Sequence, residues 1–275
     1  MTTVPYKGSP IFNDDGTFRK EDDKVQGRSY SSNLTKLLKQ LPKLQNLQEG
    51  KPASPVMAHI SLTNACNLTC SFCCFANRDI SEKMPTEKVF QALESFKAIG
   101  VTGVEFTGGG EPSIHPHFKE IVQYAKDLGF SLGICTNGAR FGADRPIKKD
   151  IVELFDWVRL GMYGFYEGYD YDLSVFEGTN CKPSAAYVWD ENLETSKNPN
   201  ITGEWSDVKN KRVLSKKFQT TENFIRMLDW VEENKIPCRI AFNAIKDVKE
   251  TEKDIETIRG IIEAYEEDRG RKLKS

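Results

Sequence analysis

The chain has 275 residues, of which 39% are hydrophobic and 28% charged, so it can bury a sizeable core within the size range of a single α/β barrel domain. With a formal net charge of −2, the chain lacks the overall basic character of nucleic-acid-binding proteins, and we expect no nucleic-acid partner. Because it has neither a long apolar run nor a signal-like N-terminus, we expect a cytoplasmic protein without a membrane partner.

The first part of the chain has little chemistry in it. Residues 1–33 are polar and have no sustained hydrophobic period, which predicts an extended or partly disordered arm. From Leu34 to Leu47 leucines recur at helical spacing, interrupted only by Pro42, and predict a helix. We favour packing of this helix against the following domain over a role in docking a partner. The expected division is an N-terminal arm and helix over residues 1–55 and a core domain over residues 56–275.

The core domain alternates between short apolar runs and amphipathic segments. Strands are predicted at Val56–Leu62, Gly103–Thr107, Phe130–Thr136, Trp157–Met162, Ser184–Trp189 and Cys238–Ala244. Helices are predicted from Thr86 to a stop at Gly100 and then at Pro116–Leu128, Ile147–Phe155, Tyr169–Phe176, Glu222–Asn234 and Glu252–Glu266. Such alternation forces parallel pairing through right-handed crossovers, so the predicted fold class is α/β, a partial (βα)6 barrel.

The carboxyl ends of parallel strands are where functional groups gather in such folds. The longest stretch without periodicity, residues 190–220, follows the fifth predicted strand and therefore starts at that edge. We expect it to form an insert or lid over the site.

Four of the seven cysteines crowd into residues 66–74, which suits metal binding in a reducing compartment better than separate disulfides. Cys66, Cys70 and Cys73 follow the first strand with the spacing CxxxCxxC. Three thiolates leave one iron of an iron–sulfur cluster open to a substrate or cofactor. Taken alone, the loop could also bind zinc or simply be buried. We interpret the adjacent Cys74 as a bystander.

A glycine-rich segment ends the second predicted strand. There Gly109, Gly110, Glu111 and Pro112 spell GGEP, and the glycines permit close approach of the backbone to a ligand. Together with the CxxxCxxC loop, this segment resembles the radical S-adenosylmethionine (SAM) superfamily over roughly residues 56–266. The resemblance implies an oxygen-sensitive [4Fe–4S] cluster on the three cysteines, with SAM on its fourth iron and the SAM ammonium bound by GGEP.

The same resemblance extends to other positions. Phe72 would contact adenine through its backbone and shield the cluster with its ring. Thr136 and Asn137 match the family's TNG segment, which reaches the SAM ribose or carboxylate. Arg159 could bind the SAM carboxylate or form a surface ion pair, and Asn243 could face the adenine.

Four residues at or beyond predicted strand ends are candidate substrate contacts: Tyr163, Tyr166, Trp189 and Asn192. The alternative is that Trp189 and the tyrosines cap the core of the barrel. No second cluster of the kind found in SPASM-bearing relatives is expected, because the remaining cysteines are scattered: Cys135, Cys181 and Cys238.

The resemblance implies an enzyme whose reduced cluster cleaves SAM to a 5′-deoxyadenosyl radical, which abstracts hydrogen from a substrate. That substrate is left open between a small metabolite or nucleotide and a peptide, and the reaction class between oxidoreductase, transferase and lyase. The expected protein partner is a reductant such as flavodoxin or ferredoxin. The alternative function is a non-catalytic Fe–S binding or electron-transfer protein on the same barrel.

Overall fold

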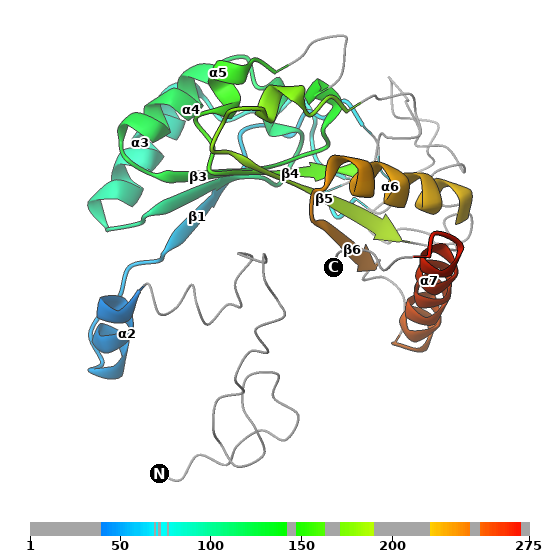
Figure 1. Ribbon diagram of the computed structural model, residues 1–275. Coiled ribbons are helices and arrows are strands. Elements are labelled where there is room, and N and C mark those ends of the chain that lie inside the picture. Colours follow the sequence, from blue (N-terminus) through cyan, green and yellow to red (C-terminus); the bar gives the residue numbers. More distant parts are fainter. Residues whose placement is uncertain are drawn as a thin grey trace. The chain divides into compact units, whose positions relative to one another are not determined.

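A computed structural model describes residues 40–68, 70, 73–75, 77–141, 147–162, 171–189, 221–242 and 248–270 (Figure 1). The chain divides into two compact units, Met1–Ala53 and Ser54–Ser275. In the first unit the structure describes helix α2 (Leu41–Gln48), which carries Pro42 in its first turn, where a missing N–H costs no hydrogen bond. The predicted helix start at Leu34 lies outside the described residues.

The second unit is built on one six-stranded parallel sheet with the order β1-β2-β3-β4-β5-β6. Its strands are β1 (Met57–Ile60), β2 (Gly103–Phe106), β3 (Ser131–Thr136), β4 (Trp157–Gly161), β5 (Lys182–Trp189) and β6 (Cys238–Phe242). Because every strand pairs in parallel with the next one along the chain, all the carboxyl ends lie at one edge. The predicted α/β partial barrel of six strands is confirmed.

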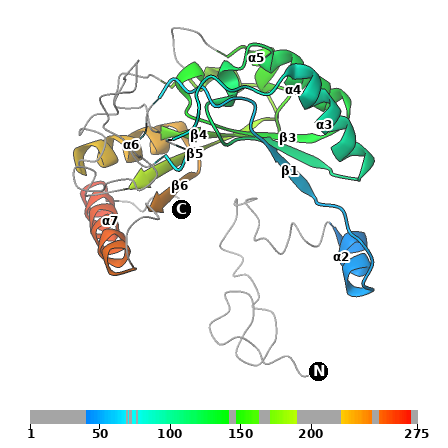
Figure 2. The same cartoon turned by 180° about the vertical axis from the view of Figure 1, so that it is seen from behind.

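The connecting segments are helices and short 3₁₀ turns. They are α3 (Thr86–Ala98), η1 (Pro112–Ile114), α4 (Phe118–Asp127), η2 (Ala139–Phe141), α5 (Lys149–Val152), η4 (Ser174–Phe176), α6 (Thr221–Asn234) and α7 (Val248–Asp268). Both views show α3, α4 and α5 along one face of the curved sheet (Figures 1 and 2). In the described part of the chain, no helix is both long and apolar enough to cross a membrane.

Two elements differ from the sequence prediction. The helix expected at Ile147–Phe155 is a single turn, because the amide of Leu154 bonds to the carbonyl of Ile151 and that of Phe155 to Val152, three residues back, which tightens the chain out of the α-helix. Of the short helical stretch expected at Tyr169–Phe176, the described part is helical only over η4.

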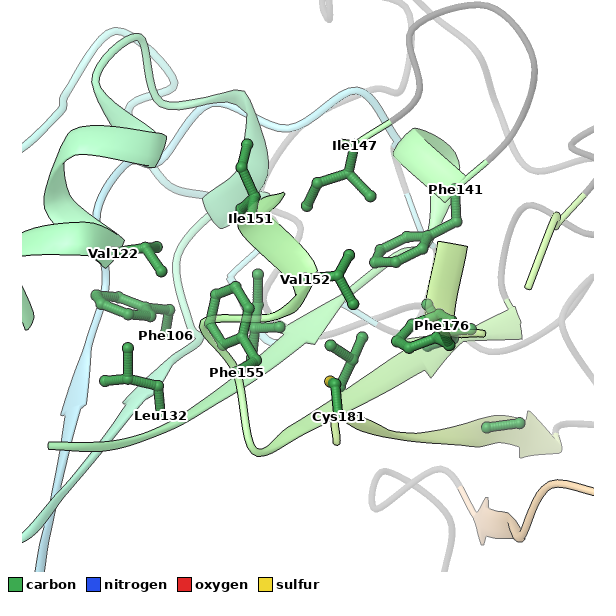
Figure 3. Packing of buried hydrophobic residues seen from close by; sticks show 14 of the residues in the cluster. Phe106, Val122, Leu132, Phe141, Ile147, Ile151, Val152, Phe155, Phe176 and Cys181 are labelled. Atoms are coloured by element: carbon green, nitrogen blue, oxygen red, sulfur yellow. The ribbon is translucent and has the colours of Figure 1, made fainter. Parts of the chain in front are cut away.

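The hydrophobic core lies between the sheet and its helices. Side chains alternate across each strand, and those facing α3 to α5 are apolar and buried: Val104, Phe106, Leu132, Ile134, Val158 and Leu160. Figure 3 shows Phe106 and Leu132 of the strands beside Val122 of α4 and Phe155 after α5. We call the opposite side of β1 to β4 the inner face; it carries His59, Glu105, Gly133, Cys135 and Arg159. The sheet is therefore apolar toward the helices and polar on its inner face.

Candidate active site

The cysteine loop after β1 is held against the glycine-rich loop after β2 by their backbones. The amide of Gly110 donates to the carbonyl of Thr63 at 2.7 Å, and that of Glu111 donates to Ala65 at 2.9 Å. A Cβ added at Gly110 would lie 1.8 Å from the carbonyl oxygen of Ala65. Glycine at this position is therefore required for the close approach, and it brings the GGEP segment to the cysteine motif.

The three motif cysteines are free thiols that lie close enough to influence one another. Burial raises the pKa of Cys66 and raises that of Cys70 well above its usual value, and the neighbouring sulfurs add to both shifts. Within the described residues, no three His, Cys, Asp or Glu side chains converge on a point for a single metal ion. A [4Fe–4S] cluster needs no such point, since each thiolate binds a different iron. The donor set at Cys66, Cys70 and Cys73 therefore fits a cluster with one iron left open.

Arg78, which the sequence analysis did not single out, braces the cysteine loop. Its Nε donates to the carbonyl of Asn64 at 2.6 Å, and its Nη1 donates to the carbonyl of Phe75 at 2.7 Å and to Cys73 Sγ at 3.4 Å. Its charge partly opposes the rise that burial causes in the pKa of Cys70. An arginine five positions after the last motif cysteine carries no local signal, so only the fold reveals its role.

Replacing Arg78 with Gln should weaken cluster retention about tenfold, because groups that hydrogen-bond to metal ligands contribute on that scale. The measurement is iron and sulfide per chain after anaerobic reconstitution and challenge with a chelator. Arg269→Gln is the matched control, since that arginine pairs with Asp229 on helix α6, away from the loop. Equal retention in the two variants would show that Arg78 does not support the cluster site.

Glu111 ties the glycine-rich loop to the end of β3. Its buried carboxylate accepts hydrogen bonds from the amide and hydroxyl of Ser113, from Thr136 Oγ1 at 2.7 Å and from the amide of Asn137 at 2.7 Å. Oε1 accepts three of these bonds, and Oε2 accepts the one from the Asn137 amide. Glu111 therefore holds the glycine-rich loop and the end of β3 in register.

Asn137 carries the end of β3 into the cysteine loop. Its Nδ2 donates to Asn67 Oδ1 at 2.7 Å and lies 3.8 Å from Cys66 Sγ. The hydroxyl of Tyr171 holds this end of the strand in place by donating to the carbonyls of Asn137 and Gly161 at 3.1 and 3.2 Å. The structure thus brings together the motifs that the sequence placed after strands one, two and three, and adds Tyr171 as a brace.

Arg159 lies on the inner face of β4, away from the cysteine loop. Its Nη1 is 3.6 Å from Cys135 Sγ, and its Cζ lies 5.4 Å from the centre of the Trp157 ring. Within the described residues, no contact links Arg159 to the cysteine loop, to GGEP or to Asn137. Its expected role at the SAM carboxylate therefore has no contact to support it.

Trp189, one of the expected substrate contacts, lies in the core. Alternation along β5 turns Trp189 toward α6, where it is 1% exposed and meets Phe224 edge-on with 5.3 Å between ring centres. Within the described residues, its packing partner is therefore a helix of the core. The other candidates lie outside the described residues: Phe72, Tyr163, Tyr166, Asn192 and Asn243.

Comparison with known proteins identifies a shared region around this site. The family model described as the Radical SAM superfamily matches residues 60–167. An S-adenosylmethionine-dependent nucleotide dehydratase of Selenomonas ruminantium is 31% identical over 98 residues, which cover 36% of this chain and 35% of that protein. The sporulation killing factor maturation protein SkfB of Bacillus subtilis is 34% identical over 85 residues, covering 30% and 20%. The chain thus spans about a third or less of the length of these curated relatives.

A solved structure shares the fold over most of this chain. Streptococcus suis SuiB bound to precursor peptide SuiA superposes with a TM-score of 0.52 at 18% identity, covering 93% of this chain and 56% of that one. At that level of identity the likeness extends to the fold alone.

Proposed function

We propose that this chain, which belongs to the radical SAM superfamily, is an enzyme that binds a [4Fe–4S] cluster on Cys66, Cys70 and Cys73 and SAM beside it. The main support for this proposal is that hydrogen bonds join the loops after β1, β2 and β3. The cysteine loop, residues 109–112 and Asn137 are bonded to one another through Thr63, Ala65 and Asn67.

Each part of this meeting point has its own task in the proposal. Cys66, Cys70 and Cys73 would hold the cluster as thiolates and would leave one iron without a protein ligand for SAM. Residues 109–112 bind the SAM ammonium, and Thr136 and Asn137 hold the loop that faces its ribose or carboxylate. When bound and reduced, the cluster supplies the electron that cleaves SAM, and the resulting 5′-deoxyadenosyl radical takes a hydrogen atom from the substrate.

The substrate in this proposal is a small molecule or a peptide. The named relatives support both, since one acts on a nucleotide by its name and the structurally similar SuiB binds a precursor peptide. The polar inner face of the sheet is the surface on which the substrate would rest, in the middle of the barrel. The insert or lid expected at residues 190–220 lies outside the described residues. A flavodoxin or ferredoxin would supply electrons.

The test is anaerobic formation of 5′-deoxyadenosine. The reconstituted protein is mixed with dithionite and SAM, and the product is measured by chromatography beside the Cys70→Ala variant. We expect product from the wild type only. Fully loaded protein that forms no more product than the variant would contradict the enzymatic proposal and favour a non-catalytic Fe–S protein.

A further inference from the structure

A row of polar side chains crosses the inner face of the sheet. His59 Nε2 lies 3.6 Å from Glu105 Oε2, Cys135 Sγ donates to Glu105 Oε1 at 3.1 Å, and Arg159 Nη1 is 3.6 Å from Cys135 Sγ. The register agrees with these contacts, since His59 pairs with Glu105 and Cys135 with Arg159. One residue from each of four successive strands therefore forms a continuous row that the cluster site does not use.

The Glu105 carboxylate and the Arg159 guanidinium are not paired directly in this row, and Cys135 lies between them. Glu105 has two neighbours, His59 and the thiol of Cys135. The half-buried guanidinium of Arg159 has no carboxylate within 4.0 Å among the described residues, and its hydrogen-bond partner there is a sulfur atom, a weak acceptor. Because a guanidinium carries five N–H donors, the described residues leave most of the hydrogen-bonding capacity of Arg159 unused.

Trp157 fixes the position of this guanidinium. The indole lies against the backbone of β3 at Gly133, where an added Cβ would fall 2.1 Å from two of its ring carbons. The guanidinium of Arg159 is stacked over the indole, with Cζ 5.4 Å from the ring centre. Cation–π stacking on a rigid platform orders the side chain before any ligand arrives, so less entropy is lost on binding.

We propose that Arg159 binds an oxyanion of the substrate, a carboxylate or a phosphate, on the inner face of the sheet. The proposal rests on the proposed function, because it names the class of substrate for the same barrel. A planar guanidinium suits both oxyanions through paired N–H donors. Cys135 connects Glu105 to Arg159 through its sulfur atom. Because the Glu105 carboxylate repels negative charge, the anionic group of the substrate lies at Arg159 and the rest of the substrate extends from there.

Cys135 belongs to this site as a neutral spacer. Burial, and then the hydrogen bond to Glu105, raise the pKa of its thiol to about 12. It therefore stays protonated at neutral pH, donates to Glu105 and adds no negative charge beside Arg159.

The test measures anion binding and SAM binding separately in the reconstituted protein. Inorganic phosphate and succinate are titrated by calorimetry, in low salt, into the wild type, Arg159→Gln, Arg159→Lys and the control Arg269→Gln. We expect one of the two anions to bind about tenfold or more weakly to Arg159→Gln, with partial rescue in Arg159→Lys and no change in the control. Whichever anion responds tells a phosphate substrate from a carboxylate one. SAM affinity should be the same in all four proteins.

Two results would overturn the proposal. Anion binding that is equal in the wild type and Arg159→Gln would show that Arg159 is not the site. Loss of SAM affinity in Arg159→Gln would instead assign this arginine to the SAM carboxylate. Failure of the proposed function can be told apart from failure of this proposal. In the first case the wild type would not cleave SAM, but the anion titration would still show whether Arg159 binds an anion.

Discussion

Replacing Cys70 with Ala should abolish the iron–sulfur cluster and leave the protein folded. The thiol is one of the three proposed donors, and we expect that two cannot hold a cubane that already lacks a fourth protein ligand. The loop itself is anchored by backbone bonds from Gly110 to Thr63 and from Glu111 to Ala65, which the substitution does not touch. The measurement is visible charge-transfer absorbance with iron and sulfide content after anaerobic reconstitution, alongside circular dichroism.

Cys238→Ala is the matched control for this prediction. Cys238 begins β6 and its sulfur lies 3.7 Å from Met227 Sδ of α6, in a contact between strand and helix. The Cys238→Ala variant should therefore keep a full cluster. Full iron and sulfide in Cys70→Ala would remove Cys70 from the ligand set. Loss of the cluster in both variants would mean that the loss is not specific to the cysteine motif.

Replacing Gly110 with Ala separates the two loops of the site. The new methyl would lie 1.8 Å from the carbonyl oxygen of Ala65, a backbone atom that cannot rotate away. Overpacking of this kind costs about 1–3 kcal/mol, and the loop must shift to relieve it. We therefore expect a lower midpoint of urea unfolding and weaker SAM binding together.

The matched control is Gly260→Ala on α7, where an added Cβ meets nothing within 4 Å. Alanine is the better helix former, so this variant should be unchanged or stabilised by up to about 1 kcal/mol. SAM affinity that is equal in Gly110→Ala and Gly260→Ala would mean that the contact between the loops is not part of the SAM site.

The strand and helix order could be predicted because the alternation of apolar segments is strong along the core domain. Parallel pairing then follows from chain connectivity, and it brings the ends of strands one, two and three to the same edge. This is why Cys66, Glu111 and Asn137, spread over 72 positions of sequence, could be expected at one site. The structure bonds the loops that carry them.

What the sequence could not supply depends on contacts between distant segments. Arg78 and Tyr171 support the site through backbone carbonyls, which have no sequence signature. Glu111 looks like a ligand residue, and only the fold shows that Ser113, Thr136 and Asn137 occupy its carboxylate. Trp189 lies at the end of its strand as predicted. The face of the sheet on which its side chain lies depends on the register of β5, which the apolar run in the sequence did not determine.

The inner face shows the same limit. Arg159 stands out in the sequence as a charge within an apolar strand, yet its partners come from two strands. Gly133 makes room for the indole of Trp157, and that indole carries the guanidinium. Such a platform becomes visible only when β3 and β4 are paired in register.

In the proposed site, three cysteines leave one iron open to SAM beside the GGEP segment. Electron paramagnetic resonance of the anaerobically reduced, reconstituted protein tests it most directly, with spectra recorded without ligand, with SAM, and with 5′-methylthioadenosine, which lacks the amino and carboxylate groups. We predict that SAM changes the spectrum of the reduced cluster and that 5′-methylthioadenosine does not. An identical spectrum with and without saturating SAM would contradict the claim.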